Sequence, residues 1–493
     1  MEARLKAKPQ VLAAAFAALL APALAFGEAR PKYGGTVDAA LLGAPATLDP
    51  VLAQTHAELE VVDLVFDTLY RVGPDGTARP HLALAEPIFD AAHTTARIPL
   101  RPNVAFQDGA PLAPADVAAS LERARKATPW VLAPVASVRA TEGAIEIVLR
   151  APVADLPALL ALPQTAITRA GRAPGDRAVG TGPFSVGALD RAHARLVLRA
   201  FDNHFAGRPY LDQVVLHWFD TPDGEARQFE IGAAQLSARG VAAFAGGTPK
   251  YPAAAVEGPP ALLVFVGFGR AHAQLLADRG FRKALDLALA RTAVVTIGTG
   301  ERVAPAVLPL PDDVPPATAL AGDLAAARAH LADAAARIPE LAPAKIGALS
   351  LEILVEETRP DDREIAERVA RALEKLGIQS KLTAVSAVAL RDRVSRGACD
   401  LYIGQLAEPV TLASAWWGAA FAAGGDDWAQ TRLAAGGIDG ASAVQEFGRR
   451  LPIVPLVFRT VRLWHRTDLR GVRFDATGRP DLADLFYVTK GKP

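Results

Sequence analysis

Residues 100–123 read LRPNVAFQDGAPLAPADVAASLER. Within this stretch Asp108 and Gly109 form a turn signal, because Asp bonds to its own backbone and Gly accepts the dihedral angles of tight turns. Pro114 favours a helix start, since its fixed φ angle suits the first helical turn. Asp116 then places a negative charge at the positive end of that helix. The stretch therefore predicts a loop, a turn and a helix that continues from Pro114.

Four shorter pieces precede this stretch in a fixed order. They are Tyr33-Gly34-Gly35-Thr36, Thr47-Leu48-Asp49-Pro50, Val65-Phe66-Asp67-Thr68-Leu69 and Pro80-His81-Leu82-Ala83. In this order the five pieces resemble the extracellular solute-binding proteins of the peptide/nickel type (family 5), the receptors that feed ABC importers. The resemblance implies a protein that captures a small molecule and hands it on, rather than an enzyme.

The resemblance extends over most of residues 33–487. Its later pieces are Gly180-Thr181-Gly182-Pro183-Phe184, the loop Asn203–Asp212, the helix-like run Phe281–Arg291, the run Ile365–Ile378 ending in Leu-Gly-Ile, and Pro452–Leu456. Most of these residues read as scaffold. We interpret Gly180 and Gly182 as glycines needed for backbone conformation rather than for ligand contact.

The resemblance implies an α/β fold of the periplasmic-binding-protein class II type, with two lobes, an additional α/β domain and a ligand cleft between the lobes. By motif we expect domain I at 26–48, 165–258 and 464–493, domain II at 49–164, and domain III at 259–463. We expect domain II to move against domains I and III. The expected crossing segments lie near Leu41–Asp49 and Ala161–Ala166.

Hydrophobic periodicity independently predicts strands that alternate with helices, which favours α/β lobes. The predicted strands are Thr36–Leu42, Ile145–Leu149, Arg195–Leu198, Gln213–Trp218, Leu262–Phe268, Leu349–Val355 and Ile453–Phe458. The predicted helices are Pro114–Lys126, Asp278–Thr292, Leu320–Ala336 and Arg359–Leu376. Gly377 follows the last of these helices at the position where glycine caps a helix end.

The bulk composition limits the classes of function. A chain of 493 residues is too long for one compact core and predicts two or three domains. Lys plus Arg and Asp plus Glu each number 53, so the formal net charge is +0. Without a basic excess to neutralise phosphates, nucleic-acid binding is not expected.

The first 25 residues predict an export signal. A basic start, a short apolar run and the small-x-small triplet that ends at Ala25 are typical of a cleaved signal peptide. The single cysteine, Cys399, allows no intrachain disulfide and lies far from the cleavage site, so no lipid-bearing cysteine is expected. We therefore predict a periplasmic protein, monomeric and free of a lipid anchor, in which Cys399 is a buried, inert thiol.

The family resemblance also implies a ligand site, and this chain departs from it. In peptide receptors of the family, a Trp-x-x-Asp segment of domain III captures the α-amine of the peptide. The corresponding stretch after Asp400 reads LYIGQLAEP, without Trp or Asp before Glu408. An unpaired ammonium in a closed cleft is costly, so a free peptide N-terminus is a doubtful ligand unless Glu408 replaces the anchor.

Four further residues are candidate ligand contacts. Phe268 and Arg270 end the predicted strand at 262–268, where relatives usually carry an Asn. The Arg270 guanidinium suits a carboxylate or phosphate, although a solvent-facing arginine is the alternative. Trp416 and Trp417 closely follow Glu408, and either faces the cleft or packs in the core.

Other functions are less consistent with the sequence. No Gly-x-Ser-x-Gly or His-Glu-x-x-His motif occurs, so an exported hydrolase is not expected. The nine histidines show no ligand spacing, and we expect neither a metal nor an organic cofactor. The main interpretation is a receptor for a peptide or other small organic solute that docks an ABC permease in the inner membrane. The alternative is a degenerate relative that docks a membrane sensor or assembly instead.

Overall fold

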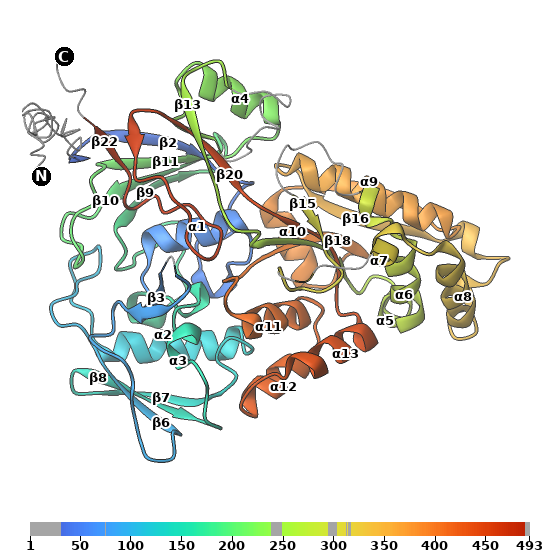
Figure 1. Ribbon diagram of the computed structural model, residues 1–493, viewed down its shortest axis with the longest axis horizontal. Helices are drawn as coiled ribbons and strands as arrows, with labels where there is room; N and C mark the ends of the chain where they lie inside the picture. The colour runs from blue at the N-terminus through green and yellow to red at the C-terminus, as the bar shows by residue number, and fades with distance from the viewer. Residues whose placement is uncertain are drawn as a thin grey trace, which may run out of the picture.

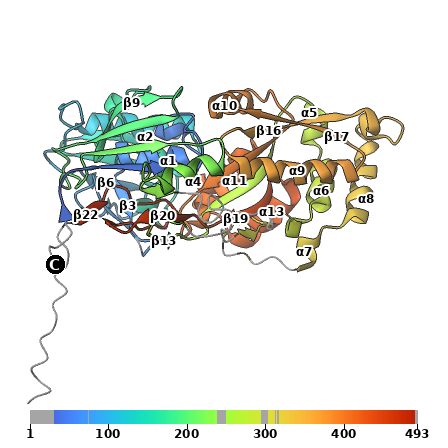
Figure 2. The ribbon, with the colours of Figure 1, turned by 90° about the horizontal axis from the view of Figure 1, so that it is seen from above.

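The computed structural model describes residues 31–488 except 74, 238–248, 294–302, 312 and 314–316. Three larger sheets organise these residues (Figure 1). The seven-stranded and four-stranded sheets lie together in one half of the molecule, which we call the first lobe. The six-stranded sheet and its helices form the other half, the second lobe, and Figure 2 shows the two halves side by side from above. The predicted α/β fold is thus confirmed, whereas the predicted signal peptide lies outside the described residues.

The seven-stranded sheet of the first lobe has the order β13-β20-β12-β2-β11-β10-β9. Its strands are β2 (Thr36–Ala40), β9 (Phe184–Asp190), β10 (Arg195–Ala200), β11 (Gln213–His217), β12 (Leu236–Ser237), β13 (Ala253–Glu257) and β20 (Arg462–Arg466). Helix α1 (His56–Val65) shares the hydrophobic core of this sheet, and α4 (Pro222–Glu230) leads into β12. Three separate parts of the chain therefore build one sheet.

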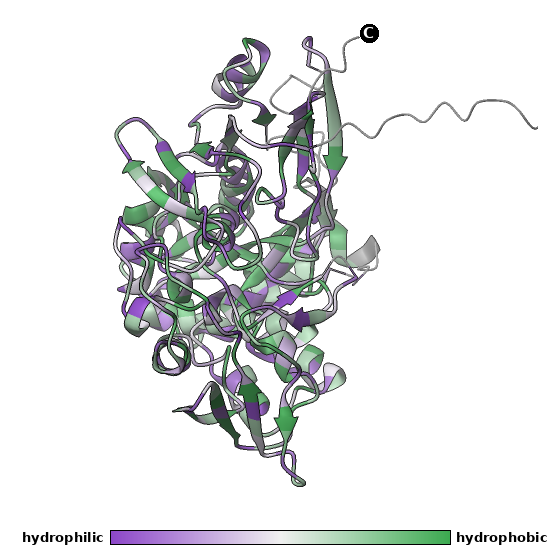
Figure 3. Ribbon diagram, turned by 90° about the vertical axis from the view of Figure 1, so that its left-hand side faces the viewer, coloured by the Kyte–Doolittle hydropathy of each residue, from purple (hydrophilic) through white to green (hydrophobic). Residues whose placement is uncertain are grey.

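The four-stranded sheet is antiparallel and completes the first lobe. It comprises β5 (Ile88–Phe89), β6 (Thr95–Pro99), β8 (Ala144–Leu149) and β7 (Val135–Thr141), with α2 (Pro114–Ala127) packed on β7 and β8. Small elements surround it, namely β3 (Tyr70–Val72), β4 (Ala78–Pro80) and α3 (Leu156–Leu159). Figure 3 shows hydrophobic and hydrophilic positions within single strands of this lobe, as expected when one sheet face meets the core.

The six-stranded sheet has the order β15-β19-β14-β18-β16-β17. Its strands are β14 (Leu262–Phe268), β15 (Val303–Pro305), β16 (Ser350–Glu356), β17 (Gln379–Val385), β18 (Leu401–Ala407) and β19 (Val454–Arg459). The helices that follow in the chain are α5 (Ala273–Ala277), α6 (Arg279–Ala288), α7 (Ala317–Ala321), α8 (Leu324–Ala335), α9 (Pro360–Lys375), α10 (Ala387–Ser395), α11 (Ala413–Ala423), α12 (Trp428–Ala434) and α13 (Gly440–Arg450).

The signature motif ties the two sheets of the first lobe together. The side-chain amide of Gln107 donates to the carbonyls of Val65, Gly182 and Phe184 at 2.8–3.0 Å, and its oxygen accepts from the Gly180 amide at 2.9 Å. A Cβ at Gly180 would lie 2.1 Å from the Val65 oxygen. These glycines are needed for close approach to the end of α1, and neither is among those with a positive φ.

The predicted elements agree with the structure within a few residues. The strand predicted at Leu262–Phe268 is β14 with identical bounds, and the helix predicted at Pro114–Lys126 ends one residue later. Gly377 follows α9 with a φ of +85°, as expected of a capping glycine.

The two lobes are connected by two short crossings of the chain. The chain enters the six-stranded sheet through residues 258–261, between β13 and β14, and leaves it through 460–461, between β19 and β20. The loop between the four-stranded sheet and α2 is joined to the end of α1 and to the start of β9 through Gln107. These two crossings connect the six-stranded sheet to the seven-stranded sheet, and the expected hinge near Leu41–Asp49 and Ala161–Ala166 stays a prediction.

Candidate functional site

A cavity of about 610 Å³ lies between the two lobes. The first lobe contributes residues 42–44, 46, 51–55, 58, 127–130 and 164 to its wall. The second lobe contributes parts of β14, β18, α10 and α11 together with Glu356 and Arg359. A volume of this size suits a small organic molecule or a short peptide, and a ligand inside would contact both lobes.

Much of the wall is apolar. The apolar side chains are Leu42, Val51, Leu52, Trp130, Phe265, Phe268, Leu390, Val394, Tyr402 and Leu406. The ring of Phe265 lies edge-on to that of Tyr402, with 6.0 Å between the centroids. The Phe268 ring packs under the Arg282 guanidinium at 4.4 Å. These contacts hold the aromatic side chains in place on the β14 and β18 face of the cavity.

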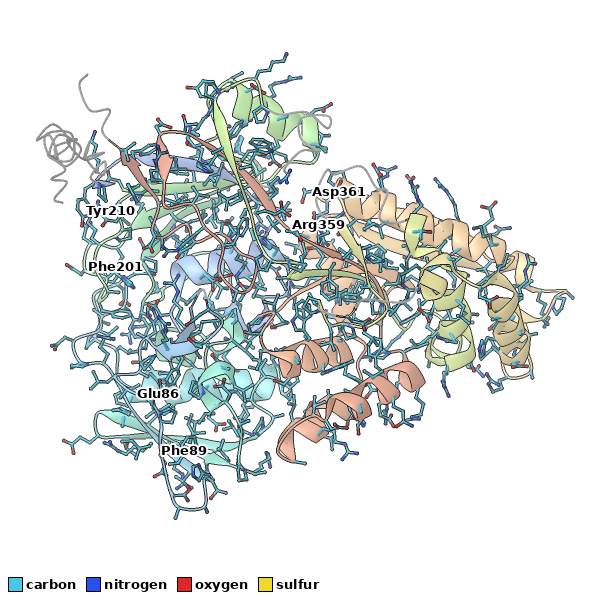
Figure 4. All side chains as sticks on the ribbon, viewed as in Figure 1. Glu86, Phe89, Phe201, Tyr210, Arg359 and Asp361 are labelled. Carbon is cyan, nitrogen blue, oxygen red and sulfur yellow. The ribbon has the colours of Figure 1, made fainter. Side chains whose placement is uncertain are left out.

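A buried ionic network forms the part of the wall between β16 and α9. Arg359 Nε donates to Glu356 at 3.1 Å, and its Nη1 lies 3.1 Å from a carboxylate oxygen of Asp362. Asp362 also faces Arg459 at 3.5 Å, and Asp361 faces the same arginine at 3.6 Å. Figure 4 labels Arg359 and Asp361 at this junction. Because its charges are paired, the network adds polarity to the wall without a large net charge.

The network also fixes the orientation of Gln405. Its side-chain nitrogen donates to both oxygens of Asp362, at 3.1 and 3.4 Å. A carboxylate only accepts, so the amide oxygen of Gln405 must point the other way. This oxygen is buried and has no hydrogen-bond partner within the described residues. Gln405 therefore adds a buried, unpaired acceptor behind the surface of the cavity wall.

Glu408, at the end of β18, is the cavity carboxylate without a directly bonded cation among the described residues. Its side chain is 3% exposed, and its Oε2 atom is buried without a hydrogen-bond partner. Burial raises the pKa of Glu408 to about 8, and the charge of Arg479 only partly opposes this shift. At neutral pH the site therefore holds a carboxylic acid that both donates and accepts.

Arg391 on α10 spans the cavity from the second lobe to the first. It donates to the Leu52 carbonyl and to the Glu58 carboxylate, each at 2.5 Å. Glu58 is also held by the backbone amides of Ala46, Gln54 and Thr55 at 3.0–3.2 Å. The Arg391 side chain therefore connects the two lobes beside the cavity, and we call its hydrogen bonds to Leu52 and Glu58 the clasp. Its Nε atom is buried and has no hydrogen-bond partner in the described part of the chain.

Three of the five candidate residues from the sequence lie in this wall, namely Phe268, Arg270 and Glu408. Trp416 and Trp417 do not line it. Both are buried on α11, where the Trp416 indole donates to the Pro409 carbonyl at 3.1 Å and Trp417 packs against Phe421 and Phe447. Trp416 packs against Phe458 of β19 and Trp417 against Phe447 of α13, and no local pattern in the sequence indicates these contacts.

Arg359, Arg391, Gln405 and Glu58 are wall residues that the sequence analysis did not identify. No short motif marks them, because they meet only in the fold. Glu58 and Arg391 are separated by 333 positions in the chain. One wall residue could have been found from the sequence. Glu356 directly follows the strand predicted at Leu349–Val355, and strand ends commonly lie at a cleft.

Metal and membrane features are absent from the described residues. No three His, Cys, Asp or Glu side chains there gather as they would around a metal ion. Cys399 is buried, and burial raises the pKa of its thiol to about 11, as expected of an inert core cysteine. None of the helices in the described ranges is both long and apolar enough to cross a bilayer.

Solved structures with the same fold cover nearly the whole chain. The oligopeptide-binding protein AppA of Bacillus subtilis, in complex with a nonapeptide, matches 93% of this chain and 100% of its own, with a TM-score of 0.74 and 16% identity. AgaA of A. tumefaciens R10, in complex with agropinic acid, matches 90% of this chain and 96% of its own, with a TM-score of 0.73 and 20% identity. At these identities the likeness shows the fold.

Curated relatives match a shorter part of the chain. The uncharacterized protein YhjP of Bacillus subtilis is 33% identical over 193 residues, which are 38% of this chain and 32% of YhjP. The HTH-type transcriptional regulator SgrR of Photorhabdus laumondii is 31% identical over 173 residues, which are 33% of this chain and 30% of SgrR. The matched part of the chain thus spans about a third of the length of these relatives.

The family model of the bacterial extracellular solute-binding proteins, family 5, matches residues 78–425. This range includes the signature stretch at 100–123, most of the second lobe and the cavity-lining strands β14 and β18. This chain belongs to the family 5 bacterial extracellular solute-binding proteins.

Proposed function

We propose that this protein is the binding component of an ABC importer, which captures a small organic solute between its lobes and delivers it to a membrane permease. The observation that carries the proposal is the cavity with walls from both lobes, clasped by Arg391. A ligand that contacts both walls stabilises the closed form by the contacts it lacks in the open form.

The distribution of unsatisfied polar atoms supports capture of a ligand. Buried polar groups are nearly always hydrogen-bonded, because leaving one unpaired costs about 1–3 kcal/mol. In the described residues, unpaired buried side-chain atoms occur at five residues of the cavity wall, Gln164, Arg359, Arg391, Gln405 and Glu408, and also at residues elsewhere such as His56 and Arg466. A bound solute would satisfy those of the cavity wall. A protein that only docks a membrane partner has no need of such an interior, so the receptor is favoured over the degenerate docking protein.

The ligand-contact residues of this proposal are Phe268, Arg270 and Glu408. Trp416 and Trp417 instead pack α11 against the core. The solute is a blocked or modified peptide, another organic molecule, or an oligopeptide held without the usual amine anchor. Similar folds hold a nonapeptide in AppA and agropinic acid in AgaA, so the fold alone leaves the solute open.

The proposed site of action is the periplasm, reached through the predicted signal peptide at residues 1–25. The protein is proposed to act there as a monomer that alternates between open and closed forms and docks the permease when closed. This assignment rests on the sequence pattern of the N-terminus and on membership of an extracellular family.

Native mass spectrometry of protein purified from the periplasm tests the proposal, followed by denaturing release of any bound molecule. A stoichiometric small molecule that also lowers the radius of gyration of the stripped protein in small-angle scattering would support a closing receptor. Empty protein that shows no thermal shift with a library of peptides and metabolites would contradict it. Recovery from the cytoplasm alone would contradict the periplasmic assignment.

A further inference from the structure

The charged groups of the cavity wall are unevenly matched. Its acidic side chains are Glu58, Glu356 and Glu408, and its basic side chains are Arg270, Arg359 and Arg391. Glu356 is bonded to Arg359, and Glu58 to Arg391. Arg270 and Glu408 remain without a directly bonded partner of opposite charge in the described part of the chain. Among the described residues, the wall therefore contains one unpaired cation, Arg270, and one unpaired acid, Glu408.

The two unpaired groups, Arg270 and Glu408, differ in burial. Arg270 is exposed and lines the cavity with a guanidinium group. Glu408 is buried, which raises its pKa to about 8. At pH 7 the acid is mostly neutral, so the wall has a net positive charge. A wall with an unpaired guanidinium attracts an anion, because opposite charges attract.

Arg270 contacts the turn that follows α10, the helix that carries Arg391. The Arg270 amide donates to the Gly397 carbonyl at 2.9 Å, and a Cβ at Gly397 would lie 2.9 Å from Cγ of Arg270. Arg391 lies on α10, which ends at Ser395, and Val394, Ser395 and Gly397 all line the cavity. The two guanidinium groups are thus presented from adjoining segments of one wall.

Arg391 retains a free donor in spite of its role in the clasp. Both of its terminal nitrogens are used by Leu52 and Glu58, whereas Nε is buried without a hydrogen-bond partner in the described residues. Glu58 does not depend on Arg391 alone, because three backbone amides also bind its carboxylate. Glu58 therefore offsets the positive charge of Arg391, and the Nε–H of Arg391 is the group left without an acceptor in the described residues.

We propose that Arg270 and Arg391 form an anion subsite, which binds the carboxylate of a small organic acid whose apolar part lies against Phe265, Phe268 and Tyr402. This inference rests on the proposed receptor function and names its ligand class. The acid contacts Arg391 at the point where that residue bridges the lobes, so binding of the anion also strengthens the clasp.

Thermal shift with paired probes tests the subsite. The pairs are N-acetyl-leucine with N-acetyl-leucinamide, N-acetyl-tryptophan with its amide, and 4-phenylbutyrate with 4-phenylbutyramide, which differ in charge and little in size. We expect the carboxylate of at least one pair to raise Tm more than its amide does. Three results would overturn the proposal: equal Tm shifts within every pair, larger shifts with the amides, or no shift with any carboxylate. The carboxylates are tested from 10 times the protein concentration up to millimolar levels.

Matched variants locate the effect. Arg270→Gln removes an exposed side chain and should fold normally, and it should reduce carboxylate affinity tenfold or more while leaving amide affinity unchanged. Arg391→Gln should do the same and also weaken closure. Arg396→Gln is the control, because this arginine caps α10, pairs with Asp392 and does not line the cavity. A carboxylate preference that survives Arg270→Gln and Arg391→Gln together would contradict the assignment.

The outcome separates this inference from the receptor function. A solute released from the native protein that still closes Arg270→Gln with unchanged affinity would leave the receptor intact and remove the anion subsite. If the wild-type protein shows no ligand-dependent closure at all, the proposed receptor function itself is contradicted. Esterification of the released solute gives a second readout. A solute with a carboxylate gains a defined mass, and the ester should no longer bind.

Discussion

At the scale of single residues, Asp67 explains why separate pieces of the signature occur together. Its carboxylate bonds to His81 at 2.7 Å and to Thr181 at 2.9 Å, and His204 lies 3.6 Å away. Burial alone would raise the pKa of Asp67, but the charge of His81 and hydrogen bonds from His204 and His81 outweigh it, so the pKa lies well below its usual range. Four motifs thus converge on one carboxylate.

Asp67→Asn should destabilise the protein by about 2–4 kcal/mol at pH 7, because the histidine side chains lose their buried counter-ion. A folded-state pKa below the unfolded value means that the stabilisation is complete above the unfolded pKa of 3.8 and is lost as pH falls through the folded value. Urea unfolding at pH 7 measures the loss. Asp223→Asn, at an exposed position in the first turn of α4, should change stability by less than about 1 kcal/mol, and an equal loss in both variants would contradict the role of Asp67.

Glu60 on α1 should make stability fall with rising pH. Burial raises its pKa to about 8, and Arg479 opposes this only in part. Between pH 4.5 and 8 the folded protein keeps a proton that the unfolded chain has lost, so the free energy of unfolding decreases across this window. Glu60→Gln should match the wild type near pH 4 and be about 1–2 kcal/mol more stable at pH 8.

Chemical unfolding across this pH range provides the measurement for Glu60. Glu86, labelled in Figure 4, is an exposed carboxylate, and Glu86→Gln should leave the pH profile as it is. A profile of Glu60→Gln parallel to that of the wild type would show that Glu60 ionises normally in the folded protein.

At the scale of elements, α11 connects the core to the cavity. A Cβ at Gly418 would lie 2.4 Å from the Trp130 ring. The backbone of α11 therefore contacts this ring directly, because Gly418 has no side chain. Gly418→Ala should therefore destabilise by about 1–3 kcal/mol through overpacking, although alanine is the better helix former by about 1 kcal/mol. Gly448→Ala on the exposed face of α13, where a Cβ meets nothing, should stabilise slightly. Thermal unfolding of both variants checks the contrast, and stabilisation by both would show that Trp130 yields readily.

The elements were largely predictable, and the reasons are local. β14 is a continuous apolar run, and α2 begins with a proline and an acidic residue, so neighbouring positions decide both structures. The bounds of Pro114–Lys126 and Leu262–Phe268 needed no knowledge of the rest of the chain. By contrast, α10 has no clear apolar stripe, and it was not predicted.

The candidate site was less predictable, because it depends on distant contacts. Phe268, Arg270 and Glu408 stand at strand ends, where side chains commonly reach a cleft, and they do line the cavity. Trp416 and Trp417 are consecutive on a helix, and only their packing against β19 and α13 decides which of their faces are covered. The contact of Arg391 with Glu58 exists only because two lobes meet.

At the scale of the whole molecule, the clasp predicts how the lobes respond to mutation. Arg391→Ala removes the hydrogen bonds to Leu52 and Glu58, while the contact of the Ala44 amide with Thr358 at 2.9 Å remains. We expect a larger radius of gyration in small-angle scattering and at least tenfold weaker ligand binding, without loss of folding. Arg396→Ala serves as the control, and unchanged scattering in Arg391→Ala would show that other contacts hold the lobes.

The first and last strands of the described chain run side by side. β1 (Pro31–Lys32) pairs with β22 (Phe486–Val488), which also pairs with β21 (Leu469–Arg470), at the edge of the first lobe (Figure 1). A short linker from residue 488 to residue 31 would therefore close the chain into a ring with little strain. New ends opened at Gly143, in the turn between β7 and β8, would give a circular permutant. In that permutant the crossings at 258–261 and 460–461 and the cavity wall remain uncut, and both ends serve as attachment points for reporters of lobe motion.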